Sequence, residues 1–147
     1  MEIERKFLVK ELPENPDRFE TTLIEQGYLC TSPVVRVRRD GDDYVLTYKG
    51  KGMMAREEVN LPLTEDAYAV LIKKCDGALI TKRRTRIPYG PYTIELDRFL
   101  GRYEGLVIAE VEFPSEEEAK RFTPPDWFSE DVTFDVRYHN SYLSKLP

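Results

Sequence analysis

The sequence has few cysteines, a single histidine and no excess of positive charge, and each shortage argues against a class of protein. Its 147 residues include two cysteines and one histidine, and the formal net charge is −5. Cys30 and Cys75 stand alone, without the spacing of metal ligands, so neither a disulfide framework nor a zinc site is expected. The negative net charge argues against a general affinity for nucleic acid or for anionic membranes.

Long apolar runs are absent as well. No segment approaches the roughly 20 apolar residues of a membrane-spanning helix, and the first residues lack the apolar core of a signal peptide. Together with two isolated thiols, this predicts a cytoplasmic protein with neither a membrane nor a nucleic-acid partner. The length predicts a single domain over 1–147 with a sizeable buried core.

Charged residues are abundant instead, at 33% of the chain against an average of about 25%. At the N-terminus they nearly alternate with apolar residues, and an alternation of period two predicts a β-strand over residues 1–9. The charged face of this strand carries Glu2, Glu4 and Lys6. An ordinary half-exposed strand has the same pattern, so this strand alone indicates no function. The informative observation is that the same arrangement recurs along the chain.

Similar patterns predict further strands and a few helices. The strands are expected at about 28–39, 44–49, 55–61, 78–87, 92–99 and 106–113, with a short one at about 132–136. Helices are expected from 15 to 27, after Thr64, from Ser115 to Phe122, and within 138–146. The Asp-Gly pair at 40–41 predicts a hairpin turn, since it tolerates positive φ angles.

Charged residues share one face of each predicted strand. They are Glu2, Glu4, Lys6, Arg36, Arg38, Lys49, Arg56, Glu58, Lys82, Arg84, Arg86, Glu95, Asp97, Glu110 and Glu112. Taken strand by strand, the simplest interpretation is an antiparallel sheet with one face in water. Two features favour a different interpretation, in which the charged face turns inward. The apolar faces of the helices must be buried, for which the apolar face of the sheet is the natural surface, and the charged rows contain few Ser, Thr, Asn or Gln. Acids also gather on different strands from bases.

If the antiparallel sheet closes into a barrel of about eight strands, all these charges converge on its interior. Unpaired charges inside a barrel are very costly unless water and a ligand of complementary charge fill it. Converging carboxylates suit Mg²⁺ or Mn²⁺. Several fixed Arg and Lys side chains suit phosphate oxygens, and their number suits a chain of phosphates such as triphosphate.

With these residues collected, the sequence resembles the CYTH, or triphosphate tunnel metalloenzyme, superfamily. Its hallmark Glu-x-Glu-x-Lys is present at residues 2–6. The similarity continues through Arg36-Val37-Arg38, Thr47-Tyr48-Lys49, Arg56-Glu57-Glu58, Lys82-Arg83-Arg84, Glu95-Leu96-Asp97 and Glu110-Val111-Glu112, and it ends in Asp131-Val132-Thr133 and Arg137-Tyr138-His139-Asn140.

The resemblance implies an α+β fold, a closed barrel of eight antiparallel strands that forms a tunnel with a charged lumen and flanking helices. It also implies a role for each set of charged residues. The metal ligands would be Glu2, Glu4, Glu110 and Glu112, with Glu58 and Asp97 as helpers. The phosphates would be bound by Lys6, Arg36, Arg38, Lys49, Lys82 and Arg84. A C-terminal helix closes the tunnel in many members and adds a basic residue, for which Arg137 is the nearest candidate, whereas Phe134 and Val136 depart from the usual residues.

The function that the resemblance implies is hydrolysis of the terminal phosphate of inorganic triphosphate with two Mg²⁺ or Mn²⁺ ions. Lys6, Glu4 and Glu112 would be its catalytic residues, in a monomer or homodimer. The rivals within the superfamily are a class IV adenylyl cyclase and a thiamine or nucleoside triphosphatase. A rival of another class is a non-catalytic module that binds polyphosphate or nucleotides. His139 is expected to have a structural or surface role, because the lumen already contains acids and bases.

Overall fold

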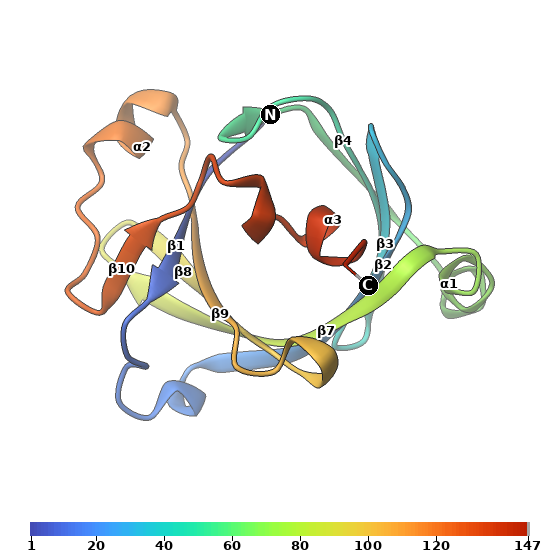
Figure 1. Cartoon of the computed structure of the whole chain (residues 1–147), viewed down its shortest axis with the longest axis horizontal. Helices are drawn as coiled ribbons and strands as arrows, with labels where there is room; N and C mark the ends of the chain where they lie inside the picture. The colour runs from blue at the N-terminus through green and yellow to red at the C-terminus, as the bar shows by residue number, and fades with distance from the viewer. Residues whose placement is uncertain (147) are drawn as a thin grey trace.

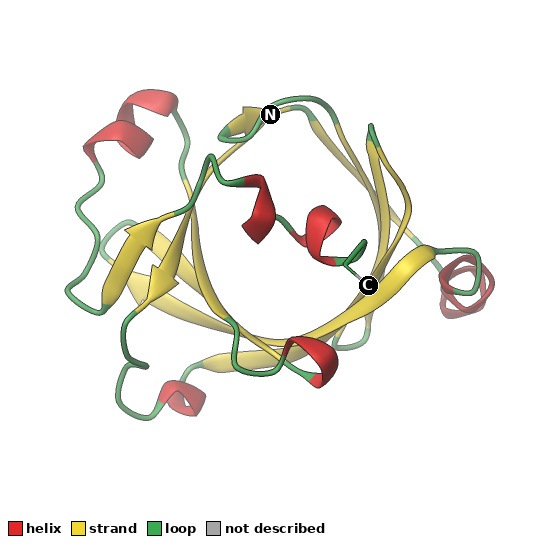
Figure 2. Ribbon diagram, in the orientation of Figure 1, coloured by secondary structure: helices red, strands yellow, loops and turns green. Residues whose placement is uncertain are grey.

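The computed structural model describes residues 1–146, and residue 147, the last of the expected domain, lies outside them. The fold is an antiparallel β-barrel with three short α-helices (Figures 1 and 2). The described strands are β1 (Glu2–Val9), β2 (Glu20–Thr31), β3 (Val34–Asp40), β4 (Asp43–Lys49), β5 (Ala55–Arg56), β6 (Glu58–Pro62), β7 (Asp76–Tyr89), β8 (Tyr92–Phe99), β9 (Val107–Glu112) and β10 (Phe128–Asp131). The helices are α1 (Glu65–Ile72), α2 (Glu116–Arg121) and α3 (Asn140–Leu143), with 3₁₀ turns η1 (Pro16–Arg18), η2 (Gly101–Tyr103) and η3 (Val136–Tyr138). None of the helices in residues 1–146 has the length and apolar character that crossing a membrane requires.

The strands follow one another around the barrel in the order β1–β9–β8–β7–β2–β3–β4–β6. The ring closes through β5, which directly precedes β6 and pairs with β1 at Glu2↔Arg56 and Ile3↔Ala55. The closed antiparallel barrel is confirmed, but its strand count differs from the predicted eight: the described sheet has ten strands, because β5 is separate from β6 and β10 is added. β10 is an addition, paired with the C-terminal part of β1.

The helix predicted for 15–27 is wrong. Only Pro16–Arg18 form a 3₁₀ turn, Asn15 makes no side-chain cap, and the rest of the segment belongs to β2. Two adjacent threonines and an isoleucine favour extended backbone because their β-branched side chains are restricted in a helix. β2 also pairs with two neighbours, β3 and β7. This pairing outweighs the local preference of Asn15 and Pro16 for the start of a helix.

Three other predicted strands differ from the observed ones. The strand expected at 28–39 is a hairpin, because Pro33 cannot donate to a ladder and lies in the turn between β2 and β3. The strand expected at 55–61 is interrupted at Glu57, between β5 and β6. The strand expected at 132–136 is wrong: β10 ends at Asp131, and a 3₁₀ turn begins at Val136.

The helix caps predicted at Thr64 and Ser115 are confirmed. The hydroxyl of Thr64 accepts a hydrogen bond from the Ala67 amide, and that of Ser115 accepts one from the Glu118 amide. The carboxylate of Glu118 accepts a hydrogen bond from the Tyr92 hydroxyl at 2.7 Å. This contact ties α2 to β8.

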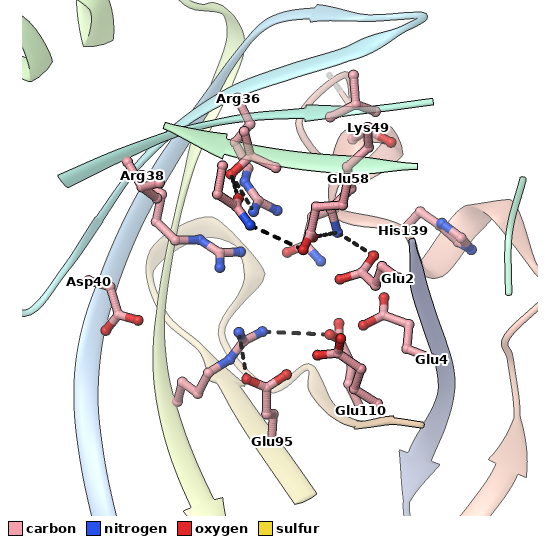
Figure 3. Close-up of a pocket in the computed structure, with 18 of the residues that line it drawn as sticks. Glu2, Glu4, Arg36, Arg38, Asp40, Lys49, Glu58, Glu95, Glu110 and His139 are labelled. Atoms are coloured by element: carbon pink, nitrogen blue, oxygen red, sulfur yellow. Dashed lines mark hydrogen bonds and ion pairs between the residues drawn. The ribbon is translucent and has the colours of Figure 1, made fainter. Parts of the chain in front are cut away.

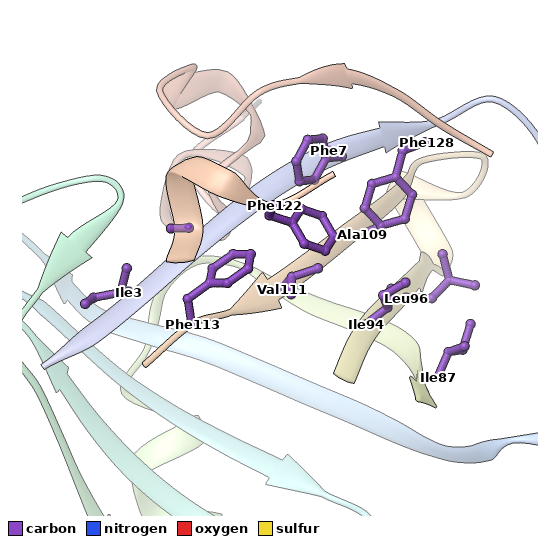
Figure 4. Packing of buried hydrophobic residues seen from close by; sticks show 11 residues of the cluster. Ile3, Phe7, Ile87, Ile94, Leu96, Ala109, Val111, Phe113, Phe122 and Phe128 are labelled. Atoms are coloured by element: carbon purple, nitrogen blue, oxygen red, sulfur yellow. The ribbon is translucent and has the colours of Figure 1, made fainter. Parts of the chain in front are cut away.

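One apolar core lies outside the barrel wall, beneath α2 and β10 (Figure 4). Its buried residues include Ile3, Phe7, Ile94, Leu96, Val111, Phe113, Phe122 and Phe128. Phe122, which follows α2, lies at 5.2 to 6.4 Å between ring centroids from Phe113 and Phe128. Burying a side chain of this size stabilises the fold by about 1.5 to 3 kcal/mol. This core therefore fixes the wall that carries β1, β8 and β9.

A second apolar core lies inside the barrel, at one end. Its buried residues are Tyr28, Val34, Ile80, Phe99, Tyr103, Ile108 and Leu143. The last of them belongs to α3, which lies within the outline of the ring in Figure 1. The amide of Ala78 donates to the carbonyl of Ser144 at 2.7 Å, and Gly77 is required beside it because a Cβ there would collide with that carbonyl. Residues 132–146, here called the plug, thus close one end of the barrel.

Candidate functional site

A cavity of about 300 Å³ occupies the barrel beyond the plug (Figure 3). Its charged lining residues are Glu2, Glu4, Lys6, Arg36, Arg38, Asp40, Asp43, Lys49, Arg56, Glu58, Lys82, Arg84, Glu95, Glu110 and Glu112. They come from strands all around the ring, since alternate residues of each strand face inward. Of the residues that the sequence assigns to the site, the cavity wall includes all but Asp97 and Arg137.

Carboxylates crowd together on one side of the cavity, where Figure 3 shows Glu2, Glu4 and Glu110 pointing toward one another. Glu4 is buried, and its carboxylate has neither a hydrogen bond nor an ion pair with any of the described residues. Burial and the nearby Glu110 and Glu2 raise the pKa of Glu4 to about 8. Burial, with Glu2 next, also raises the pKa of Glu112, which lies at the rim. Neither Glu4 nor Glu112 forms an ion pair with a base in residues 1–146.

Glu2 and Glu110 are compensated by bases. Glu2 accepts a hydrogen bond from Lys49 Nζ at 2.9 Å, and Lys49 also lies 3.5 Å from Glu58. Glu110 lies between Lys6 Nζ at 3.4 Å and Arg84 Nη2 at 3.6 Å. Although burial opposes its ionisation, Lys6 and Arg84 together hold the pKa of Glu110 well below its usual range. Glu110 is therefore an anion, whereas burial raises the pKa of Glu2 although Lys49 opposes the change.

Arginines gather on the other side of the cavity. Arg38 has no ion pair among the described residues, and burial together with Arg36 and Arg84 lowers the pKa of its guanidinium to about 9. Arg36 donates to Thr47 Oγ1 at 3.3 Å, and its buried Nε has no hydrogen-bond partner in residues 1–146. Like charges brought this close repel one another, so an anion between them would be strongly favoured.

Asp97 lies behind two of the bases rather than in the cavity wall. It is fully buried, and its two oxygens accept bonds from Arg84 Nε at 2.8 Å and Nη2 at 2.9 Å. Lys82 Nζ lies 2.8 Å from the same carboxylate and donates to Asn140 Oδ1 at 3.1 Å. Burial lowers the pKa of Lys82 to about 8 although Asp97 opposes the change. Asp97 thus orients two bases, and both of its oxygens are already engaged.

The plug brings residues to the cavity that the charge pattern did not single out. His139, Asn140 and Ser141 line it. Lys6 Nζ donates to the carbonyl of Tyr138 at 3.3 Å. Burial and Lys6 lower the pKa of His139 to about 4, and its Nε2 is bonded to the Thr133 carbonyl. The neutral, hydrogen-bonded His139 fits the structural role expected for it.

Arg137 does not reach the cavity. Its side chain is 68% exposed, and Asp135, two residues earlier, holds its guanidinium at 2.6 Å. Asp135 also caps η3 by accepting from the Arg137 amide, so one carboxylate fixes both the backbone and the side chain. The family pattern led us to expect a basic residue in the lumen here, and the ion pair with Asp135 was not predicted.

The lining suits divalent cations only together with a ligand. In the part of the chain that the structure describes, no group of three Asp, Glu, His or Cys residues is already arranged to hold an ion. Mg²⁺ usually binds one or two protein carboxylates and completes its octahedral shell with water and substrate phosphates. The uncompensated Glu4 and the rim residue Glu112 offer hard oxygen ligands of this kind. The residues present therefore fit a metal ion shared with a phosphate ligand.

Sequence and structure comparisons agree on the relatives of this chain. An inorganic triphosphatase of Nitrosomonas europaea is 38% identical over 97% of this chain and 96% of its own length. An inorganic triphosphatase of Acetivibrio thermocellus is 39% identical over 99% and 94%. A crystal structure of an inorganic triphosphatase superposes with a TM-score of 0.73 at 34% identity, covering 100% of this chain and 96% of that one.

A more distant structure shares the fold alone. A putative adenylate cyclase of Bacillus halodurans superposes with a TM-score of 0.66 at 18% identity, over 100% of this chain and 92% of that one. The family model described as the CYTH domain matches residues 1–145. The chain belongs to the CYTH domain family.

Proposed function

We propose that this protein hydrolyses the terminal phosphate of inorganic triphosphate with the help of Mg²⁺ or Mn²⁺. The observation that carries the proposal is the composition of one enclosed cavity, in which guanidinium and ammonium groups face a cluster of carboxylates. A site that only bound anions would gain nothing from the carboxylates. Two relatives of nearly the same length, which are inorganic triphosphatases, support the same substrate.

The bases would bind the phosphate chain. Arg36 and Arg38 can each offer paired N–H donors, which match the oxygens of a phosphate group. Arg84 is already bonded to Asp97 and Glu95, so it would contribute mainly positive charge. Lys6, Lys49 and Lys82 can add single charges around the chain. These groups would also stabilise the negative charge that develops on the transferred group and on the departing pyrophosphate. Arg137 is left out of this set, because Asp135 holds it at the surface.

The carboxylates would hold the metal ions, of which we propose two. Glu4, Glu112, Glu2 and Glu58 are the proposed ligands, with Glu110 beside them and Asp97 left to orient Lys82 and Arg84. When bound, the ions supply neutralisation of phosphate oxygens and a water of lowered pKa. Glu4, buried without a partner, would release its proton to bind a cation, because metal and proton compete for the same oxygens.

At the end of the barrel that the plug closes, the cavity has no room for an organic group attached to the phosphates. Tyr28, Ile80 and Leu143 fill that end of the barrel, so an organic group attached to the triphosphate could extend only through the opposite end. We therefore rank inorganic triphosphate above ATP or thiamine triphosphate. The free thiols of Cys30 and Cys75 support a reducing location, and we propose the cytoplasm.

The test is release of phosphate from inorganic triphosphate, ATP and thiamine triphosphate, each with Mg²⁺, Mn²⁺ or excess chelator, together with an assay for cyclic AMP. We expect phosphate from inorganic triphosphate with either metal, at least tenfold less from the organic substrates, and none with chelator. Cyclic AMP formed from ATP without free phosphate would favour a cyclase. Tight binding of triphosphate with neither product would favour a non-catalytic binding module.

A further inference from the structure

Gln26 is a fully buried polar residue that forms no part of the cavity wall, yet it contacts two residues that do. It lies on β2 directly opposite Arg38 of β3, and Ile80 of β7 flanks it on the other side. Its Oε1 accepts a hydrogen bond from Arg38 Nε at 2.8 Å, and its Nε2 donates to the Tyr28 hydroxyl at 3.1 Å. Both ends of the amide are thus engaged by residues that line the cavity.

The orientation of this amide follows from the chemistry of its partners. A guanidinium has only donors, so the amide oxygen must face Arg38 and the amide nitrogen must face Tyr28. Tyr28 follows two residues later on the same face of β2, which places its hydroxyl within reach of that nitrogen. Tyr28 therefore anchors the far end of the amide, and the near end holds Arg38 Nε.

The contact fixes Arg38 without neutralising it. With Nε engaged, the two terminal nitrogens of Arg38 remain to bind a ligand in the cavity. Arg84 is held differently, since Asp97 accepts from its Nε and partly cancels its charge. A neutral amide can orient a guanidinium and leave its whole charge available to an anion, whereas a carboxylate at the same position would form an ion pair with it.

We infer that Gln26 is a positioning residue for phosphate binding: it holds the guanidinium of Arg38 over the cavity while keeping that group free of any counter-charge. The inference rests on the proposed function, because Arg38 is taken to bind triphosphate. It adds a residue outside the cavity wall to the binding machinery. It also predicts that a carboxylate is not an acceptable replacement there, although glutamate has the same shape as glutamine.

The test uses Gln26→Met, which keeps the volume and removes both hydrogen bonds, and Gln26→Glu, which keeps the shape and adds a negative charge. For each we would measure KM and kcat with triphosphate and Mg²⁺, and the affinity for triphosphate by calorimetry in chelator. We expect KM and the dissociation constant to rise about tenfold or more in both variants, the worth of one hydrogen bond to a charged group. We expect kcat to change less than about threefold. Glu25→Gln, on the outward face of the same strand, is the matched control and should leave KM unchanged.

A double-mutant cycle shows whether Gln26 acts through Arg38. If it does, Gln26→Met combined with Arg38→Met should bind triphosphate no more weakly than Arg38→Met alone. Additive losses, or an unchanged KM in Gln26→Glu, would overturn the inference. Should Gln26→Met fail to fold, Gln26→Glu alone decides by the same measurement. If the unsubstituted protein bound triphosphate without hydrolysing it, the proposed function would fail, and the calorimetric comparison would still test Gln26.

Discussion

At the scale of single residues, two buried carboxylates on neighbouring strands have opposite properties. Glu110 has Lys6 and Arg84 beside it and stays ionised, whereas Glu4 has no partner in residues 1–146 and a pKa of about 8. Alternation in the sequence predicted that both face the lumen. It could not predict which one is compensated, because that depends on the lengths and directions of side chains from three different strands.

Replacing Arg38 by methionine tests the arginine side of the cavity. We expect KM for triphosphate to rise roughly tenfold to a hundredfold, since a hydrogen bond to a charged group contributes about 1.5 to 3 kcal/mol. The empty protein should melt at a higher temperature, because Arg36 and Arg84 lose a like-charged neighbour. The control is Arg39→Met, on the exposed face of the same strand. Equal KM values for the two variants would remove Arg38 from the site.

Replacing Asp97 by asparagine tests its role as a counter-charge for Lys82 and Arg84. Removing one partner of a fully buried ionic group leaves uncompensated charge, and we expect a loss of about 3 to 5 kcal/mol in the free energy of unfolding. Asp17→Asn, which breaks a surface pair with Arg98, should change stability little. Urea denaturation measures both. Similar small losses would show that Asp97 is not needed to hold the two bases.

At the scale of elements, local signals in the sequence predicted the structure correctly where that structure depends on neighbouring residues alone. The caps at Thr64 and Ser115 and the hairpin at 40–43 are confirmed. The failures concern segments whose structure depends on distant partners. β2 is extended because β3 and β7 pair with it, and the plug lies inside the barrel because Leu143 packs there. Neither partner is visible in a short window of sequence.

The plug gives a prediction of its own. Leu143→Ala should lower the free energy of unfolding by about 2 to 4 kcal/mol, because it leaves a hole in the inner core that the surrounding barrel cannot fill. Leu12→Ala, at a side chain that is 45% exposed, is the matched control and should cost much less. Chemical denaturation followed by fluorescence of Trp127 measures both. If both losses were small, the plug would not be packed in the barrel in solution.

At the scale of the whole molecule, the barrel encloses acids and bases that would be more stable in water. The cost of burying them is visible in their pKa values, which burial raises for Glu4 and lowers for Lys82 and Arg38. The sequence predicted this conflict, because charged rows on most strands must converge once the sheet closes. Buried charges that destabilise the fold without ligands would be compensated when cations and a polyanion bind. The same cavity is therefore expected to bind both tightly.

The stability of the empty protein should therefore depend on pH. Between pH 6.5 and about 8, where His139 is neutral in both states, the folded state keeps a proton on Glu4 that the unfolded state has released. The free energy of unfolding therefore falls as pH rises in this range. The fall is at most roughly 2 kcal/mol, at about 1.4 kcal/mol for each pKa unit. Glu4→Gln should flatten this part of the curve, whereas the exposed control Glu117→Gln should not. Identical slopes for the unsubstituted protein and Glu4→Gln would contradict the assignment.

The central claim is that the carboxylates and the bases of one cavity act together on one triphosphate. The most direct measurement is the rate of phosphate release from inorganic triphosphate in saturating Mg²⁺ by Glu4→Gln, beside calorimetric binding of triphosphate in chelator. We predict that turnover falls at least a thousandfold, about 4 kcal/mol in barrier, while affinity for triphosphate without metal is kept or increased. Full turnover by Glu4→Gln would contradict the account.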